Sequence, residues 1–184
     1  RAAPDAGAQA LDAVRAAASV DWRRYLLVFP QWAARLAQAG LDAGCEVDFL
    51  RQAIRERRLA PPDPWRNDWP WRLRVRVLGD LRIERDDERL STGGKAPKKP
   101  LQLLVLLAAH PGGLEQGAVI DELWPSLEAN APRASLEMAV SRLRKLLDVP
   151  DAVLVADGRL SLNTALMWTD VAAFSALDDA AAGG

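Results

Sequence analysis

Residue types that often carry chemistry are scarce in this chain, which has one cysteine and one histidine among 184 residues. The single cysteine, Cys45, excludes an intrachain disulfide and a cluster of thiolate ligands for zinc, and it is typical of a reducing compartment. The sequence also lacks a signal peptide and an apolar run long enough to cross a membrane. We therefore expect a soluble, cytoplasmic protein without a membrane segment.

Catalytic motifs are missing as well. His110 precedes Pro111 at the expected end of a helix, where an imidazole is better placed to meet the last carbonyls than to act as a base. The segment Thr92–Lys95 lacks the spaced first glycine and the final hydroxyl residue of a phosphate loop. No Ser/His/Asp set, paired metal ligands or dinucleotide fingerprint occurs. The sequence predicts no enzymatic activity, no cofactor and no metal.

An overall excess of positive charge is also lacking, because the net charge is −1 and the pI is about 5.9. Any nucleic-acid site must therefore be a local patch. Between Lys95 and Lys145 the chain has seven basic and five acidic residues, and the basic ones cluster at expected helix ends and on one helix face. That region is the best candidate for such a patch.

The most informative segment is the helix expected from Arg133 to Leu147. Apolar residues recur in it at intervals of four, three and four, which predicts one buried face: Leu136, Val140, Leu143 and Leu147. The predicted contact residues lie on the other faces and are small, apolar or basic: Arg133, Ala134, Ser135, Met138, Ser141, Arg142, Arg144 and Lys145. Small groups let a helix approach base edges, while flanking cations reach phosphates or guanine. The alternative interpretation is an ordinary solvated helix face.

The neighbouring segments favour DNA binding. We expect a buried helix over Lys98–His110, then a shorter helix over Glu115–Trp124 that ends at Pro125, and a third helix that begins near Ala131. Two helices joined by a loop before the basic helix make a helix-turn-helix topology. After it, Val153–Leu162 alternates around an Asp-Gly pair, which predicts a hairpin. Helix and hairpin in this order are typical of a winged helix.

The hairpin tip has a weak charge. Arg159 is its only basic residue and the one placed to enter a minor groove, but Asp157 beside it reduces the local positive potential.

Ahead of the helices, the segment Arg72–Leu78 alternates basic and apolar residues, turns at Gly79-Asp80 and continues to Leu90, which predicts a small antiparallel sheet. The basic row (Arg72, Arg74 and Arg76) is either a phosphate patch or, as we prefer, a solvated sheet face with Glu84 and Glu88 as cross-strand partners.

These residues resemble the OmpR/PhoB type of winged helix, in which Val140–Leu147 matches the end of the recognition helix and Asp121–Pro125 the end of the preceding helix. A narrower resemblance is to the winged helix that precedes bacterial transcriptional activator domains. It rests on five segments: Leu78-Gly79, Lys95–Leu104, Leu123–Pro125, Ser141–Leu147 and Trp168–Asp170. The chain departs from the OmpR/PhoB type at Ala134 and Ala139, where a basic or imidazole side chain is common, so the resemblance implies few base contacts.

Further upstream, Ala39–Pro62 and Trp69–Gly79 resemble the junction in MalT-like, ATP-dependent regulators of proteobacteria. In those proteins an NTPase module and helical repeats precede a C-terminal winged helix. The resemblance implies that this chain is an excised C-terminal piece whose partners include upstream domains of the same protein. The start at Arg1 without an initiator methionine agrees with a fragment.

The N-terminal region reads as three helices, Ala8–Ser19, Trp22–Ala39 (interrupted near Pro30) and Val47–Arg58. As the end of a repeat array they would lack a neighbour on one side, so we expect exposed aromatic residues there: Trp22, Phe29 or Trp32. The segment from 61 to 71, rich in proline and tryptophan, reads as a stiff linker whose indoles pack back on one or both domains.

The resulting fold class is mainly α with small antiparallel sheets. It comprises a helical, repeat-like segment (1–60), a linker (61–71), an OmpR/PhoB-type winged helix-turn-helix (72–166) and the start of a C-terminal helix from Trp168 (167–184).

The function predicted from these features is DNA-binding transcriptional regulation. The helix Arg133–Leu147 would enter the major groove of double-stranded DNA. Contacts with the DNA backbone would come from Lys95, Lys98 and Lys99, and a further contact from Arg159 at the wing. The loop Pro125–Pro132 would be free to touch RNA polymerase. The alternative is a winged-helix module for protein interaction or signalling that has lost DNA binding, as Ala134, Ala139 and the acidic pI permit.

Overall fold

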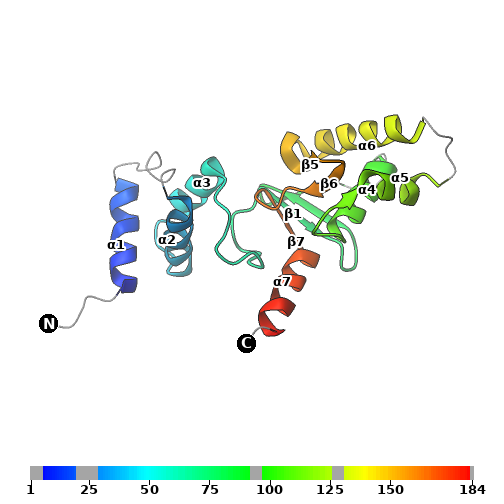
Figure 1. The fold of residues 1–184 in the computed structure, drawn as a ribbon. Helices are drawn as coiled ribbons and strands as arrows, with labels where there is room; N and C mark the ends of the chain where they lie inside the picture. The colour runs from blue at the N-terminus through cyan, green and yellow to red at the C-terminus, as the bar shows by residue number, and fades with distance from the viewer. Residues whose placement is uncertain (1–5, 20–28, 92–96, 126–130, 183–184) are drawn as a thin grey trace. The chain divides into compact units, whose positions relative to one another are not determined.

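The computed structural model describes residues 6–19, 29–91, 97–125 and 131–182. It divides into two compact units, Arg1–Trp71 and Arg72–Gly184. Their elements are shown in Figure 1.

The described part of the first unit contains the helices α1 (Ala6–Ser19), α2 (Pro30–Asp42) and α3 (Val47–Arg57). They pack closely around Gly40, where an added Cβ would lie 2.5 Å from Cδ1 of Leu50 and 3.4 Å from Val14. A larger residue at Gly40 would therefore require the Leu50 side chain to shift.

The segment rich in proline and tryptophan packs on the first unit. Trp69 is 1% exposed and its indole N–H donates to the Leu59 carbonyl at 3.0 Å, while the Trp71 indole donates to the Arg66 carbonyl at 2.7 Å. The Arg66 guanidinium pairs with Asp68 at 2.6 Å and with Asp42 at 2.8 Å. These two carboxylates raise the pKa of Arg66 above its ordinary value. The segment thus continues the core of the helices that precede it.

The expected exposure of aromatic residues is confirmed for Phe29 and Trp32, which are 66% and 64% exposed. Trp22 lies outside the described residues.

The second unit begins with a four-stranded sheet in the order β3-β2-β1-β7. Its strands are β1 (Leu73–Arg76), β2 (Arg82–Arg85), β3 (Glu88–Arg89) and β7 (Met167–Thr169). The first three are antiparallel as expected, whereas β7 pairs with β1 in parallel. The sheet therefore extends past residue 166, and the helix that we expected from Trp168 begins only at Asp170, as α7 (Asp170–Ala182).

A local hydrogen bond and two long-range hydrogen bonds mark the change from strand to helix at this point. The Thr169 hydroxyl accepts the Ala172 N–H at 3.1 Å, which is the bond of an N-cap residue. The Asp170 carboxylate accepts the N–H groups of Val77 and Leu78 at 2.9 Å, and so ties the start of α7 to the end of β1. Trp168 therefore belongs to the sheet.

The helices α4 (Lys98–Ala108), α5 (Gln116–Leu123) and α6 (Ala131–Leu147) form the core with this sheet. The apolar stripe predicted for α6 is buried, with Leu136 3%, Val140 6%, and both Leu143 and Leu147 0% exposed. Helix α6 is the next helix after α5, as the predicted helix-turn-helix requires, although residues 126–130 between them lie outside the described part of the chain.

The hairpin after α6 is formed by β5 (Val153–Ala156) and β6 (Arg159–Leu162), which follow the short 3-10 helix η2 (Pro150–Ala152). Asp157 has φ +50° and Gly158 has φ +77°, the conformation that a two-residue primed turn requires. The predicted wing is therefore present. A strand that the sequence did not indicate, β4 (Leu114–Glu115), adds a third strand beside β6. Together these elements make a winged helix-turn-helix fold.

The basic row on β1 is part of the sheet structure and not a free patch. Arg74 is 8% exposed and pairs with Asp87. Arg76 pairs with the cross-strand Glu84 at 2.8 Å, and its guanidinium lies 5.5 Å from the Trp168 ring. The Arg76–Glu84 pair agrees with the structural interpretation that we preferred. The solvated face expected there is wrong for Arg74, which is buried and pairs with Asp87.

Candidate nucleic-acid interface

The exposed face of α6 is the part of the predicted site that the structure leaves open to solvent. Its exposed residues are Ala134, Met138, Ser141, Arg142 and Lys145. Neither Arg142 nor Lys145 forms a hydrogen bond or an ion pair with the described residues. Because the opposite side of α6 is anchored in the core, this face is held rigidly outward.

Two other predicted residues of α6 flank this face. Arg133 is exposed and lies 3.6 Å from Glu137 in a pair one helical turn apart, with both side chains more than two-thirds exposed. Such pairs are weak in water, so Arg133 can exchange its partner for a phosphate. Ser135 is half-buried at the edge of the face.

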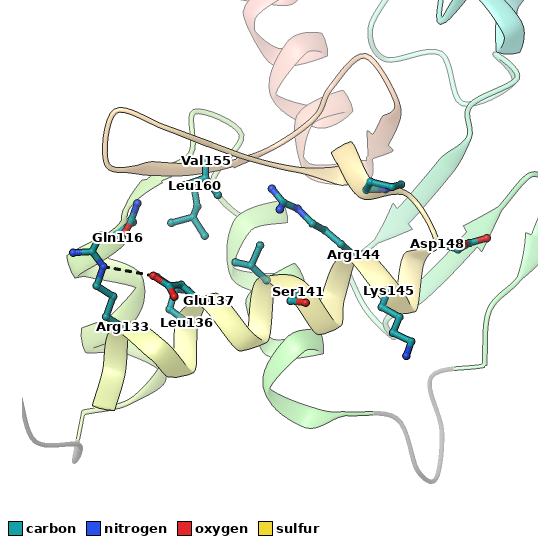
Figure 2. Close-up of a pocket in the computed structure, with 12 residues that line it drawn as sticks. Gln116, Arg133, Leu136, Glu137, Ser141, Arg144, Lys145, Asp148, Val155 and Leu160 are labelled. Atoms are coloured by element: carbon teal, nitrogen blue, oxygen red, sulfur yellow. Dashed lines mark ion pairs between the residues drawn. The ribbon is translucent and has the colours of Figure 1, made fainter. Parts of the chain in front are cut away.

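Arg144 differs from the expectation. It is half-buried, and its Nη2 donates to the Val153 carbonyl at 2.6 Å, while its buried Nε has no hydrogen-bond partner. Figure 2 shows Arg144 reaching from α6 toward the wing, whereas Lys145 points away from it. Arg144 therefore links the helix to the wing.

A groove of 540 Å³ lies between α6 and the wing (Figure 2). Apolar side chains from both elements line it: Leu136, Val140, Val155 and Leu160. Its charged lining residues are of both signs: Arg133, Glu137, Arg144, Lys145 and Asp148. Ser141 and Lys145 of the exposed α6 face also line the groove, so it joins that face to the hairpin.

The lysines at the start of α4 have different environments. Lys98 is exposed, and its side chain forms no hydrogen bond or ion pair with the described residues. Lys99 donates from Nζ to the Leu123 carbonyl at 2.5 Å and lies 5.6 Å from the Trp124 ring centroid. Lys99 thus caps the end of α5. Lys95 and residues 126–130 of the predicted contact loop lie outside the described residues.

Arg159 at the wing is bound within the protein. Its Nη1 donates to Glu115 at 2.7 Å, and its Nη2 donates to the carbonyls of Gly113 at 3.0 Å and Gly112 at 3.3 Å. Glu115 was not a predicted site residue, because the pair is 44 positions apart and forms only when β4 joins the wing.

His110, the histidine considered as a catalytic base, contacts the end of a helix. The His110 ring Nδ1 lies 2.8 Å from the Leu106 carbonyl, which confirms the capping role. In the parts of the chain that the structure describes, no group of His, Cys, Asp or Glu is arranged to hold a metal ion. Over the same ranges, no helix combines the length and the apolar character that crossing a membrane needs.

Comparison with known proteins gives a partial likeness. No family model matches the chain. Over 76 residues it is 38% identical to "Regulatory protein AfsR" of Streptomyces coelicolor, a match that covers 41% of this chain and 8% of that protein. Among solved structures it is similar to EmbR of Mycobacterium tuberculosis, in complex with a low-affinity phosphopeptide, with 28% identity and a TM-score of 0.43. That match covers 50% of this chain and 25% of EmbR. The chain therefore shares part of its sequence with a bacterial regulatory protein many times its length.

Proposed function

We propose that the second unit binds double-stranded DNA and is the DNA-binding part of a bacterial transcriptional regulator of the OmpR/PhoB type. The observation that carries this proposal is the exposed face of α6. It is the second helix of a helix-turn-helix, and its cations Arg142 and Lys145 have no partner among the described residues. A rigid helix with free cations beside small side chains fits the width of a major groove.

Each residue of this surface has a role in the proposal. Arg142 and Lys145 contact phosphates or a guanine edge, and Lys98 and Arg133 contact the backbone at the periphery. The centre of the face lies against base edges, where Met138 or Ala134 can touch a thymine methyl. Because this centre has few hydrogen-bonding groups, we expect DNA shape to contribute much of the specificity.

The larger context is also a proposal. The exposed Phe29 and Trp32 on the first unit support the MalT-like arrangement, in which preceding helical repeats would cover such residues. The loop from Pro125 to Pro132 would contact RNA polymerase. We place the protein in the cytoplasm, where its DNA would be, and assign it a binding role without a catalytic step.

A second candidate function is a protein-interaction module. Three of the predicted DNA-binding cations, Lys99, Arg144 and Arg159, are bound to partners within the protein. In addition, Met138 is 51% exposed at the centre of the α6 face, where an apolar side chain also suits a protein partner.

A salt titration separates the two functions. The 184-residue chain is mixed with a fluorescent duplex of random sequence, and the affinity is measured by anisotropy over a series of salt concentrations. DNA binding predicts a steep negative dependence of log K on log salt, and Lys145→Ala should flatten the slope by about one. Arg82→Ala is the matched control, because Arg82 is an exposed cation of β2, outside the proposed surface. No measurable duplex binding, or equal effects of the two variants, would contradict the proposal.

A further inference from the structure

The wing carries an ion pair that the proposed DNA contacts do not explain. Antiparallel pairing of β4 with β6 places Glu115 directly opposite Arg159. The Glu115 carboxylate accepts from Nη1 at 2.7 Å, and the adjacent Nη2 donates to two carbonyls, those of Gly112 and Gly113. The guanidinium is thus bound on two sides by the segment that precedes α5.

The backbone holds this arrangement in place. Gly113 has φ +76°, and an added Cβ there would lie 2.6 Å from the Leu160 carbonyl oxygen, so only glycine allows so close an approach to the wing. The Gln116 N–H donates to the Gly158 carbonyl at 2.8 Å, which fixes the segment on the other side of Glu115. The backbone therefore keeps Glu115 opposite Arg159.

The pair also changes the charge of the wing. Arg159 is the only basic residue of the hairpin, whereas Asp157 and the adjoining Glu115 are both acidic. With Glu115 in place, this end of the domain has no net positive charge to attract a phosphate.

We propose that Glu115 restrains non-specific DNA binding by holding Arg159 away from the phosphate backbone. This inference rests on the proposed DNA-binding function. Affinity for random duplex depends almost entirely on phosphate contacts, so neutralising a cation at the wing lowers that affinity. Neutralising Arg159 weakens the specific complex less, because base contacts of α6 and DNA shape also stabilise that complex. Glu115 thereby raises the ratio of specific to non-specific binding.

The pair is open to competition. The side chains of Arg159 and Glu115 are 48% and 60% exposed, and ion pairs at that exposure are weak and screened by salt. When α6 is docked in its specific site, a nearby phosphate can replace the carboxylate as the partner of Arg159.

The experiment measures random-duplex affinity of the 184-residue chain against salt for the wild type, Glu115→Gln, Arg159→Ala and the double variant. Glutamine keeps the size of the side chain and removes its charge. We expect Glu115→Gln to tighten binding about fivefold to tenfold near 50 mM salt and to steepen the slope by about 0.9. Arg159→Ala alone should have the same salt slope as the wild type. The double variant should also have the wild-type slope, because the cation that Glu115→Gln releases is then absent. Glu122→Gln is the control, because Glu122 is an exposed carboxylate of α5 with no ion pair among the described residues.

The outcomes separate this inference from the proposed function. If the wild type binds with a steep salt slope and Glu115→Gln behaves like it, the inference is wrong and the proposed function stands. A flatter slope for Arg159→Ala alone also overturns the inference, because Arg159 would then reach a phosphate despite Glu115. If the wild type does not bind DNA under any salt condition, both fall. Thermal midpoints of all variants verify that each is folded.

Discussion

The exposed face of α6 and the wing each have cations that the sequence predicts to bind DNA, but these cations have different environments. Arg142 and Lys145 on α6 have no partner in the described parts of the chain, whereas Arg159 on the wing is bound by Glu115 and two carbonyls. Arg144 lies between the two regions and donates to the wing backbone. The two α6 cations are therefore available to a phosphate at once, whereas Arg159 must first exchange the acceptors that it already has.

The difference follows from how each surface is built. The cations of α6 point outward because the opposite side of the helix is anchored in the core by Leu143 and Leu147, both 0% exposed. The wing is a thin ribbon, so β4 lies within reach of its side chains and supplies acceptors. The cations Arg142 and Lys145 therefore have no acceptor among the described residues, whereas Arg159 has acceptors in Glu115 of β4 and in the two residues before that strand.

The largest effect should come from the anchor of α6. Leu143→Ala removes a fully buried side chain from the core, so we expect the free energy of unfolding to fall by about 2–5 kcal/mol, measured by denaturant titration. Met138→Ala, on the exposed face of the same helix, is the control and should change it by less than about 0.5 kcal/mol. Similar losses for the two would mean that α6 is rotated from the orientation described.

The next largest effect on stability should come from a substitution where β4 lies close to the wing. Gly113→Ala adds a Cβ at a positive φ against the Leu160 carbonyl, which should destabilise the domain by about 1–3 kcal/mol. Gly117→Ala is the matched control, because its Cβ would meet no atom within 4 Å, and it should be neutral or slightly stabilising. Denaturant unfolding of both variants tests this, and equal stabilities would show that β4 does not contact the wing as described.

Substitutions of the two lysines of α4 should have opposite effects, one on stability and the other on DNA binding. Lys99→Met removes the bond to the Leu123 carbonyl, so it should lower the free energy of unfolding by about 1 kcal/mol and leave the salt slope of DNA binding unchanged. Lys98→Met should do the reverse, with unchanged stability and a slope flatter by about one. The assignment of these roles fails if Lys99→Met flattens the slope while stability is retained.

The sequence was sufficient for the elements whose signals are local. The spacing of Leu136, Val140 and Leu143 predicted both α6 and its buried side, and the Asp157-Gly158 pair predicted the hairpin, because periodicity and turn conformation depend on neighbouring residues. The start expected for the last helix, Trp168, was wrong, because Trp168 and Thr169 belong to β7. Parallel pairing with β1, about 94 residues earlier in the register, decided the outcome.

The partners of individual cations were beyond a reading of the sequence. Lys99 binds a carbonyl 24 residues away and Arg159 a carboxylate 44 residues away, and neither acceptor is marked by any local pattern. Residue type indicated which side chains are able to contact DNA. The tertiary structure then showed which of them already have a partner.

The most direct test of this account compares the salt slopes of Arg142→Ala/Lys145→Ala and Arg159→Ala with that of the wild type on one random duplex. If the face of α6 supplies the phosphate contacts and the wing cation is held by Glu115, the α6 double variant loses about two units of slope while Arg159→Ala loses none. A slope that is unchanged in the α6 double variant and flatter in Arg159→Ala would contradict the account.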